Sequence, residues 1–526
     1  MAGFRRLVHR KFEWNAARRP EQTAVVFGEV AWTYDELNKQ ANKFAHFLLS
    51  CGVSQRSIVG VCLYPSTDLV VSILAILKIG AAYSPLDPAY PCERLRLMLS
   101  QLDDLRVVVA SSRTRALLPE RCVRIVDIDA MSAAVDRASA INPAPDIWPG
   151  HLCYVVFTSG TTGIPKAVAI RHSGWWNLLT WLEHEYQLNP HSSNLLVSAF
   201  GFDISQRSLM TPLFTGSTLH LLPSSAFDVM MAKEIIAKYG IRTLHCAPST
   251  LYLLLESDTG DEAALDSLDY VFIGGEALAA RRVVDWASKP GRKCKLLHQY
   301  GVAECTDIAS SHLMRDFERY VETGVPIGAP VSNCVIHILN DELAPVGINE
   351  VGEICISGAG VGAGYLNNDA LNRERFLALG PERGGIQIYR TGDLGRIQPN
   401  SDIICVGRMD NQVKIRGIRL DLGEVENALR SSRYIEDAVV LAVCGETDQA
   451  TYDLVAFVVS PSRFRDRHAF DERELRSELA SSIPRHMIPR QFVKVDTFPV
   501  TQNGKIDRKE LKRMYNLSMS SRLTPV

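Results

Sequence analysis

The chain has 526 residues, of which 46% are hydrophobic and 22% are charged. This length allows roughly two to four domains, and the composition is close to the average of globular proteins, so a disordered chain, a collagen and a coiled coil are excluded. The 57 basic and 59 acidic side chains give a formal net charge of −2, which predicts no general attraction to nucleic acid or to an anionic membrane.

The first two-thirds of the chain alternate short apolar runs with amphipathic segments. Residues 57–63 predict a strand, residues 66–78 predict a helix that stops near Gly80, and residues 84–88 predict a turn-rich loop. Further strands are predicted at residues 105–110, 152–158, 194–199, 217–222 and 270–273. Strands and helices in alternation are typical of α/β layers around largely buried sheets.

From about Glu350, short strands and glycine-rich turns replace this alternation, with strands predicted at residues 352–358, 403–406 and 412–415. The last hundred residues predict a compact unit of helices and strands, at residues 422–431, 435–443, 454–459 and 472–479. The polar turn from Gly407 to Asn411 separates the two patterns. By itself this turn fits a domain junction and a loop within one domain equally well.

The sequence predicts a cytoplasmic enzyme. Its longest strongly apolar stretch, from Leu69 to Leu77, is interrupted by Ser72 and is far shorter than the ~20 residues that cross a bilayer. The basic N-terminus is not followed by the apolar run of a secretory signal. The 12 cysteines include no Cys-x-x-Cys pair, which indicates reduced thiols rather than disulfides or a zinc site.

The strongest local motif is the loop Thr158-Ser-Gly-Thr-Thr-Gly-Ile-Pro-Lys166, which follows a predicted strand. Its hydroxyls, its glycine amides and its terminal ammonium can all face phosphate oxygens. The spacing is not that of a Walker A loop, and Ala167 takes the place of the Ser or Thr that binds magnesium there. Composition alone also allows a solvated turn, but the strand-like segments on both sides favour a phosphate-binding loop.

A second glycine-rich run, from Gly358 to Gly364, follows a strand and superficially matches a dinucleotide-binding fingerprint. The residues after it, Tyr365 to Asn368, do not begin an apolar helix, and no strand that ends in an acidic residue follows at the required distance. We therefore interpret this run as a close-packed turn and set a dehydrogenase function aside.

The phosphate loop belongs to a series of motifs that resembles the adenylate-forming superfamily, which comprises acyl-CoA synthetases, luciferases and nonribosomal peptide synthetase adenylation domains. The series spans residues 32 to 508 and is most similar to a stand-alone adenylation domain that activates an amino acid. Its other members are residues 32–37, 77–87, 202–205, 274–276, 300–304, 352–358, 364–366, 389–393, 407–417, 483–489 and 503–507.

The resemblance implies an α/β fold in two parts. We expect residues 1–409 to form a large multilayer N-terminal domain of stacked sheets and helices, with a small β-rich subdomain, that binds ATP and the amino acid. Residues 410–526 would form a small, mobile α+β domain that carries the catalytic lysine. Asp410 is the implied hinge between them, because a polar turn between strands suits a change of backbone angles.

ATP and Mg²⁺ are the cofactors that the resemblance implies. It assigns Asp393 to the ribose hydroxyls, which an acceptor-only carboxylate suits, and Tyr300 to the face of the adenine. Glu304 is the implied magnesium ligand, because Mg²⁺ prefers hard oxygen donors. The other implied nucleotide contacts are Thr158, Ser159, Gly160, Thr161, Thr162, Gly163, Gly275, Glu276 and Arg408. Without these motifs, Asp393 and Arg408 would be interpreted as a surface ion pair.

Three residues are implied in catalysis, namely Lys166, Glu304 and Lys505. Lys505 lies in a tight polar turn, where most lysines are simply solvated. A mobile ammonium at this position can stabilise the transition state in which the substrate carboxylate and ATP, two anions, meet. The carboxylate is already ionised at neutral pH, so the first step requires no general base.

Asp203 resembles the acidic residue that pairs with the α-ammonium group in amino-acid-activating members; a helix N-cap is the alternative. The rest of the implied pocket wall is Ile204, Arg207, His245, Val271, Ile273, Gln299, Asp307 and Ile308. An unpaired charge in such a pocket costs several kcal/mol, so we expect Arg207 to bridge to Asp307 rather than to Asp203. This wall predicts a small or medium polar amino acid as substrate.

The predicted function is that of an acid–thiol ligase. It converts an amino acid and ATP to aminoacyl-AMP and pyrophosphate, and then transfers the aminoacyl group to the phosphopantetheine thiol of a separate carrier protein in nonribosomal peptide or related secondary-metabolite synthesis. A small activator protein is a further candidate partner, and neither nucleic acid nor membrane is expected as one. An acyl- or aryl-CoA ligase stays open as an alternative, which Asp203 disfavours.

A non-catalytic nucleotide-binding relative, acting as a scaffold, is the other alternative. It rests on departures from the family pattern: Ala303 stands where threonine is usual beside Glu304, and His298 stands where an asparagine usually contacts the adenine edge. Loss of the threonine hydroxyl is worth about 1 kcal/mol of transition-state stabilisation. Because Lys166, Glu304, Asp393 and Lys505 are all present, we favour the enzyme.

Overall fold

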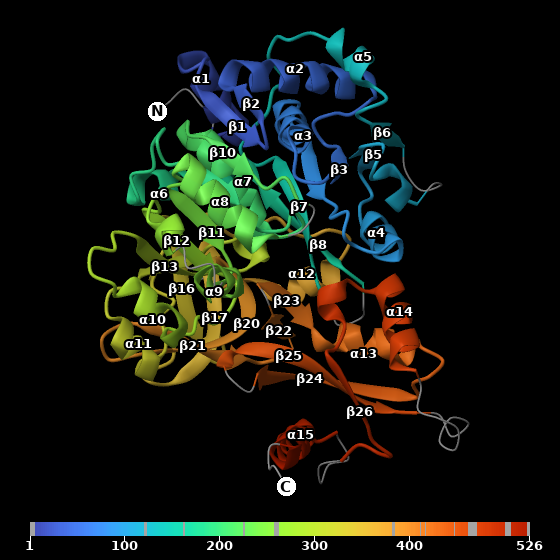
Figure 1. The fold of residues 1–526 in the computed structure, drawn as a ribbon, viewed down its shortest axis with the longest axis vertical. Helices are drawn as coiled ribbons and strands as arrows, with labels where there is room; N and C mark the ends of the chain where they lie inside the picture. Colours follow the sequence, from blue (N-terminus) through green and yellow to red (C-terminus); the bar gives the residue numbers. More distant parts are fainter. Residues whose placement is uncertain are drawn as a thin grey trace.

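The computed structural model of the chain contains two large sheets, a smaller third sheet and a C-terminal unit of helices and short sheets (Figure 1). It describes residues 6–119, 124–160, 164–224, 227–256, 262–380, 384–410, 412–415, 417–445, 448–460, 471–499 and 506–522. The N-terminal helices lie at one end of the molecule, and the C-terminal unit lies at the other (Figure 1).

The first sheet is largely parallel, with antiparallel strands at both edges. Its described strands lie in the order β15 (Ala329–Pro330), β14 (Ser310–Leu313), β13 (Lys295–Tyr300), β12 (Tyr270–Gly274), β11 (Thr243–Cys246), β9 (Asn194–Leu196), β10 (Leu219–Leu221), β1 (Thr23–Phe27) and β2 (Val30–Thr33). The strand predicted at residues 194–199 is therefore shorter than expected, because pairing along β9 ends at Leu196.

The second sheet is mixed, and the phosphate loop joins two of its strands. Its order is β18 (Gly364–Tyr365), β8 (Lys166–Arg171), β7 (Leu152–Thr158), β4 (Ala82–Pro85), β3 (Ile58–Cys62), β5 (Leu105–Ala110) and β6 (Ile125–Asp127). The prediction of a loop at residues 84–88 is wrong in its first half, because β4 pairs with β3 as far as Pro85. Proline is tolerated there because it ends the strand.

Helices separate and cover these sheets. In the N-terminal part they are α1 (Val8–Arg18), α2 (Tyr34–Ser50), α3 (Thr67–Lys78), α4 (Cys92–Leu99), α5 (Ser132–Asp136), α6 (His172–Glu185), α7 (Asp203–Thr215), α8 (Val229–Tyr239), α9 (Pro248–Glu256), α10 (Arg281–Ala287), α11 (Phe317–Thr323) and α12 (Asp369–Arg375). Helix α3 contacts β1 of the first sheet and β3 and β4 of the second. Consistent with this place between the sheets, its residues from Leu69 to Lys78 are all buried.

The third sheet and the C-terminal unit follow in the sequence. The third sheet contains β16 (Cys334–Leu339), β17 (Val351–Gly358), β20 (Gln387–Ile397), β19 (Phe376–Ala378) and β21 (Ile403–Arg408). The C-terminal unit contains the hairpin β22 (Gln412–Ile415) and β23 (Ile418–Asp421), the sheet β24 (Asp437–Gly445), β25 (Asp448–Val459) and β26 (Gln491–Lys494), and the helices α13 (Leu422–Arg430), α14 (Glu472–Ser482) and α15 (Arg508–Arg522). The predicted fold class is confirmed. The boundary at residue 410 stays a prediction.

No helix of the described part of the chain has both the length and the apolar composition that a membrane crossing requires.

A fully buried lysine ties the N-terminal helices together. The Lys78 ammonium at the end of α3 donates to Glu13 Oε1 at 2.9 Å, to Asn38 Oδ1 at 2.8 Å and to Asn142 Oδ1 at 2.9 Å. These three acceptors come from α1, α2 and the segment before β7, so every proton of the ammonium is used. Burial lowers the pKa of Lys78 to about 8 even though Glu13 opposes the shift.

We predict that Lys78→Ala lowers the free energy of unfolding by about 3–5 kcal/mol, because Glu13 loses its buried cation. Lys43→Ala is the control: its ion pair with Asp136 lies at the surface and is worth about 0–1 kcal/mol. Chemical denaturation followed by circular dichroism measures both losses. Equal losses in the two variants would contradict the role given to Lys78.

Candidate functional site

The candidate site lies at the carboxyl ends of neighbouring parallel strands. Gly274 of β12 is opposite Gln299 of β13, so the segments that follow the two strands leave the sheet side by side. Three cavities meet at this edge, and Gly275 contributes to the wall of each. Open α/β sheets bind their ligands outside the carboxyl ends of the strands, so these cavities are the candidate ligand site. They are called the first, second and third cavity.

The phosphate loop borders the first cavity. Thr158 and Ser159 lie on its wall, together with Ala303. A side chain at Gly160 would place its Cβ 2.2 Å from the carbonyl oxygen of Ile164, so the turn requires a glycine there. Thr161, Thr162 and Gly163, the middle of the predicted loop, lie outside the described residues.

Lys166 begins β8 directly after the loop. Burial and the neighbouring charge of Arg419 lower the pKa of Lys166, although Glu304 opposes the shift. The ammonium therefore lies within electrostatic reach of both groups. Lys505, the predicted catalytic lysine, lies outside the described residues.

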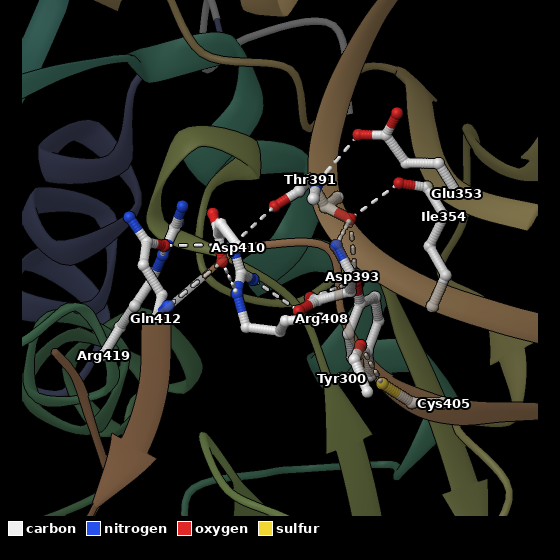
Figure 2. Close-up of polar contacts among 12 residues, drawn as sticks. Tyr300, Glu353, Ile354, Thr391, Asp393, Cys405, Arg408, Asp410, Gln412 and Arg419 are labelled. Carbon is white, nitrogen blue, oxygen red and sulfur yellow. Dashed lines mark hydrogen bonds and ion pairs between the residues drawn. The ribbon is translucent and has the colours of Figure 1, made fainter. Parts of the chain in front are cut away.

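The second cavity contains the residues predicted to bind the nucleoside (Figure 2). Tyr300 and Asp393 line it, and the Tyr300 hydroxyl donates to Asp393 Oδ2 at 2.7 Å. Arg408 contacts the other oxygen of Asp393. Asp393 is 2% exposed, so this is a buried cluster, and the alternative of a surface ion pair is wrong.

Arg408 links this cluster to the predicted hinge. Its Nε and Nη2 donate to the two carboxylate oxygens of Asp410, at 2.7 and 2.9 Å, and Nη2 also donates to Gln412 Oε1 at 3.0 Å. Figure 2 shows the resulting chain of contacts from Asp393 to Gln412. Arg408 holds the pKa of Asp410 below its usual value against the effect of burial. Asp410 is thus fixed in this arrangement, and its role as a hinge stays a prediction.

Glu304 is fully buried beside the first cavity and has a cationic partner. Arg419 Nη1 lies 3.1 Å from each of its carboxylate oxygens, and the Tyr365 hydroxyl donates to Oε1 at 2.6 Å. Burial alone would raise the pKa of Glu304, but Arg419 and Tyr365 outweigh it and keep the pKa below its usual value. The carboxylate is therefore ionised at neutral pH.

The donors around Glu304 meet the needs of a metal ion only in part. Among the described residues no group of three or more His, Cys, Asp or Glu side chains could hold a metal. One ionised carboxylate suits Mg²⁺ when substrate phosphates supply further oxygens. Both oxygens of Glu304 are engaged by Arg419, however, so the carboxylate fits a metal only after Arg419 leaves.

Residues of the hairpin β22–β23 line all three cavities. The Lys414 ammonium lies 5.5 Å from the centre of the Tyr300 ring, and the Gly417 amide donates to Glu276 Oε1. On the opposite side, Ser159 Oγ of the phosphate loop donates to the Arg419 carbonyl at 2.9 Å. Residues predicted to bind ATP are thus in contact with the C-terminal unit.

Asp203 lies at the junction of the first and third cavities. The N-cap of α7 is Phe202 and Asp203 is the first residue of the helix, so Asp203 does not occupy the N-cap position that the alternative gave it. Among the described residues, its carboxylate accepts only the neighbouring Ile204 amide, at 2.8 Å. Burial, and then the charge of Asp307, raises the pKa of Asp203 to about 7. The charges of Arg207 and Lys414 oppose this rise, but neither forms an ion pair with Asp203 among the described contacts.

Arg207 is fully buried one turn further along α7 and does not pair with Asp203. Its Nε donates to Asp307 Oδ2 at 2.6 Å, and its Nη1 contacts His245 Nδ1 at 3.0 Å and Gln299 Oε1. The expected bridge from Arg207 to Asp307 is confirmed. It leaves Asp203 available to a ligand.

The third cavity, of about 220 Å³, contains most of the predicted amino-acid pocket. The predicted wall residues that line it are Asp203, Ile204, Arg207, Gln299, Asp307 and Ile308. His245, Val271 and Ile273 are also buried but do not line it. The two apolar residues alternate along β12 and pack into a separate hydrophobic cluster, so they back the wall.

Backbone strain fixes the direction of Asp307. Thr306 and Asp307 both have positive φ, of 59° and 71°, a conformation that is costly for residues other than glycine. The Thr306 hydroxyl donates to the Gly360 carbonyl at 2.6 Å. A Cβ on Gly301 would lie 1.9 Å from the Asp307 carbonyl oxygen, so only a glycine allows this close approach.

Sequence reasoning missed Arg419 and Lys414 as site residues. Both lie in a short hairpin in which basic and apolar residues alternate, a pattern that predicts a strand with its charged side facing solvent. The contact of Arg94 in α4 with Glu424 in α13, 330 residues later, was also missed. Each of these contacts joins segments far apart in the chain, and no local pattern signals such a pairing.

Two family models match most of the chain. The model of the AMP-binding enzyme family matches residues 12–366, and the model of the AMP-binding enzyme C-terminal domain matches residues 424–505. The first match includes the phosphate loop, Asp203 and Glu304, and the second includes most of the C-terminal unit.

Curated relatives match nearly the whole chain. Tyrocidine synthase 2 of Brevibacillus parabrevis is 35% identical over 508 residues, which are 95% of this chain and 13% of that protein. Gramicidin S synthase 2 of Brevibacillus brevis is 35% identical over 517 residues, which are 97% of this chain and 11% of that protein. The chain thus spans less than a fifth of the length of either relative.

Solved structures share the fold. An NRPS protein containing adenylation and PCP domains, bound to a vinylsulfonamide inhibitor, has a TM-score of 0.83 and 26% identity over 97% of this chain and 84% of its own. The o-succinylbenzoate CoA synthetase of Bacillus subtilis has a TM-score of 0.82 and 19% identity over 95% of this chain and 97% of its own.

We predict that Arg419→Met lowers the free energy of unfolding by about 3–5 kcal/mol at neutral pH, because Glu304 keeps its burial and loses its cation. The pKa of Glu304 would then rise above its unfolded value, so the variant's deficit should shrink as the pH falls from 7.5 to 5. Denaturant titrations at both pH values measure this change.

The double variant Glu304→Gln/Arg419→Met tests the pairing itself. Removing both charges should recover part of the loss caused by Arg419→Met, which a double-mutant cycle reports as a coupling energy. Strict additivity of the two single changes would show that the ion pair does not stabilise the fold.

Proposed function

The chain belongs to the AMP-binding enzyme family, and from this premise we propose that it activates an amino acid. An amino acid and ATP would give aminoacyl-AMP and pyrophosphate. The aminoacyl group would then pass to the phosphopantetheine thiol of a separate carrier protein, and AMP would leave. The observation that carries this proposal is the unpaired carboxylate of Asp203 at the mouth of the third cavity.

Asp203 favours an amine-bearing substrate on physical grounds. A carboxylate with a pKa raised to about 7 gains most from a cation placed against it, and an α-ammonium group is such a cation. Fatty and aryl acids bring no amine and would leave Asp203 unpaired. The cavity of about 220 Å³ is smaller than the ~300–1,000 Å³ of pockets for drug-sized ligands, which suits a molecule of amino-acid size.

The relatives support the same assignment. Both curated relatives are named as synthases, one of tyrocidine and one of gramicidin S. The solved neighbour at 26% identity joins an adenylation domain to a PCP domain, which supports a carrier protein as partner of this chain. A small activator protein stays a prediction. The ten cysteine side chains that the structure describes are all free thiols, and we propose a reducing, cytoplasmic compartment.

The nucleoside would bind in the second cavity. There the Tyr300 ring offers a flat face for the adenine, and Asp393, held by Tyr300 and Arg408, offers carboxylate lone pairs to the ribose hydroxyls. Lys414 lies against the same ring, so nucleotide entry requires this side chain to move. The Thr158–Gly163 loop would then face the phosphates.

In the proposed chemical step, one carboxylate oxygen of the amino acid attacks the α-phosphorus of ATP, and the bond to the pyrophosphate oxygen breaks. Lys166 and Lys505 would stabilise the negative charge that gathers at this phosphorus, and Asp203 would hold the α-ammonium so that the carboxylate points toward it. Ala303 lines the same cavity with a methyl group and contributes no hydrogen bond. Glu304 would hold Mg²⁺, which neutralises phosphate charge when bound.

The described arrangement suits a step other than adenylation. Arg419 is paired with both oxygens of Glu304, and the hairpin β22–β23 contacts residues proposed to bind ATP. We therefore propose that residues 410–526 turn about Asp410 before ATP binds. The bidentate contact between Arg408 and Asp410 would break or re-form during this turn. Residues 1–409 would stay fixed and carry both substrates.

Pyrophosphate exchange into ATP tests the proposed function. With each of the twenty amino acids and with a panel of fatty and aryl acids as substrate, we expect exchange that depends on at least one amino acid. Exchange driven only by fatty or aryl acids would show a CoA-ligase-type enzyme. Absence of exchange with every acid, in protein that binds ATP, would show a non-catalytic relative.

We predict that Lys505→Ala lowers the exchange rate by roughly 100-fold or more and changes the Kd of ATP less than about threefold. The reason is that this ammonium acts on the transition state rather than on nucleotide docking. Lys512→Ala, a change at an exposed position of α15, is the control and should match the wild type. Calorimetric titration measures the Kd of ATP, and exchange kinetics measure the rate. An exchange rate in Lys505→Ala equal to that of the wild type would refute the assignment.

We predict that the KM for the amino acid falls about tenfold between pH 6 and pH 8. Asp203 is mostly protonated below its pKa of about 7, and only the ionised form attracts the ammonium. Asp203→Asn should raise the KM and flatten this profile, while the KM for ATP serves as the internal control. A steep profile that survives in Asp203→Asn would assign the titration to another group.

A further inference from the structure

The wall of the third cavity contains an amide donor with no partner. Gln299 is 2% exposed, and its Nε2 has no hydrogen-bond partner among the described residues. Its Oε1 accepts from Arg207 Nη1. Because a guanidinium only donates, it fixes the orientation of the amide, and Nε2 must be directed away from Arg207. A buried donor left without an acceptor is unfavourable, so a ligand that brings an acceptor is stabilised at this position.

His245 holds this arrangement from behind the cavity. Burial keeps the pKa of His245 well below its usual value, so the ring is neutral. Its Nδ1 faces Arg207 Nη1 and therefore accepts, which places the ring proton on Nε2. The ring also stacks on Phe272, with centroids 4.6 Å apart. Arg207 is thus held on two sides by neutral acceptors and on a third by Asp307.

Asp307 offers an acceptor to the same cavity. Its Oδ2 takes the Arg207 Nε proton, and within the described part of the chain Oδ1 has no partner. The left-handed backbone at Thr306 and Asp307 holds the carboxylate in this direction. Gln299 and Asp307 both line this cavity, and among the described residues Gln299 Nε2 and Asp307 Oδ1 have no hydrogen-bond partner.

The charges of the cavity cancel once an amino acid is bound. Arg207 and Asp307 neutralise each other, and the α-ammonium of the substrate would neutralise Asp203. A side chain with a further charge would have no counter-ion in a buried site, which costs several kcal/mol. An apolar side chain would leave the donor of Gln299 unsatisfied. Both classes are therefore disfavoured.

We propose that the substrate is an amino acid with a neutral side chain that both accepts and donates hydrogen bonds, and that a carboxamide is the group the cavity selects. The carbonyl oxygen of the carboxamide would accept from Gln299 Nε2, and its NH₂ group would donate to Asp307 Oδ1. Ile204 and Ile308 line the same cavity and would flank the methylene groups. This inference rests on the proposed function and names the substrate class of the same site.

The test compares kcat/KM for matched side chains in the exchange reaction. Asparagine and glutamine should exceed their charged counterparts aspartate and glutamate, and the apolar leucine and methionine, by at least 100-fold. Ornithine and lysine should be equally poor. A charged or apolar amino acid as the preferred substrate would overturn the inference and leave the proposed function intact, whereas no exchange with any amino acid would overturn the proposed function.

A charge change in the wall gives the second measurement. Asp307→Asn removes the counter-charge of Arg207, so the preference should move from carboxamide toward carboxylate side chains by at least tenfold in the ratio of kcat/KM values. Asp369→Asn, at an exposed position of α12, is the matched control and should keep the wild-type ratio. A wild-type ratio in Asp307→Asn would overturn the inference.

Circular dichroism shows whether Asp307→Asn folds. If it does not, Gln299→Glu is the test variant, because it replaces the free donor by an acceptor and keeps an oxygen toward Arg207. This variant should lose at least tenfold in kcat/KM for the carboxamide substrates and not for ATP. Unchanged selectivity in Gln299→Glu would likewise overturn the inference.

Discussion

The arrangement of this protein depends on one constraint: the fully buried carboxylate of Glu304 must have a cation beside it. In the described structure that cation is Arg419, which the hairpin β22–β23 delivers from the C-terminal unit. The same hairpin places Lys414 over Tyr300 and the Gly417 amide on Glu276. The charge requirement of Glu304 thus stabilises the described docking of the C-terminal unit, because an unpaired buried carboxylate is strongly unfavourable.

In the third cavity, unlike at Glu304, the charged side chains belong to one part of the chain, residues 1–409. Arg207 and Asp307 form a pair within the protein, and their neighbours His245 and Gln299 are neutral. Asp203 is the one carboxylate among the described residues of this cavity that forms no ion pair, and burial, followed by the charge of Asp307, raises its pKa. The two ends of the site therefore differ in this structure: Glu304 has a counter-ion beside it, whereas Asp203 forms no ion pair with a described residue.

Much of the fold could be predicted from the sequence, for reasons that are local. The strands at residues 105–110, 152–158 and 412–415 have the predicted ends, because apolar runs between turn residues mark their own limits. The helix over residues 66–78 ends before Gly80, whose φ of 79° suits a glycine. Proline misled the prediction at residues 84–88, where the strand β4 lies between β3 and β7 and its pairing with β3 extends to Pro85.

The sequence by itself predicted the family and the loop at residues 158–166, because both follow from the order and spacing of motifs. It also predicted the bridge from Arg207 to Asp307, because an unpaired buried charge is costly. Only the tertiary structure decided that Arg419 pairs with Glu304, that His245 and Gln299 hold Arg207, and which amide proton of the wall is left free. These contacts join residues about 40 to 115 positions apart. A buried polar group takes whichever partner the packing brings near, and packing is decided by the whole chain.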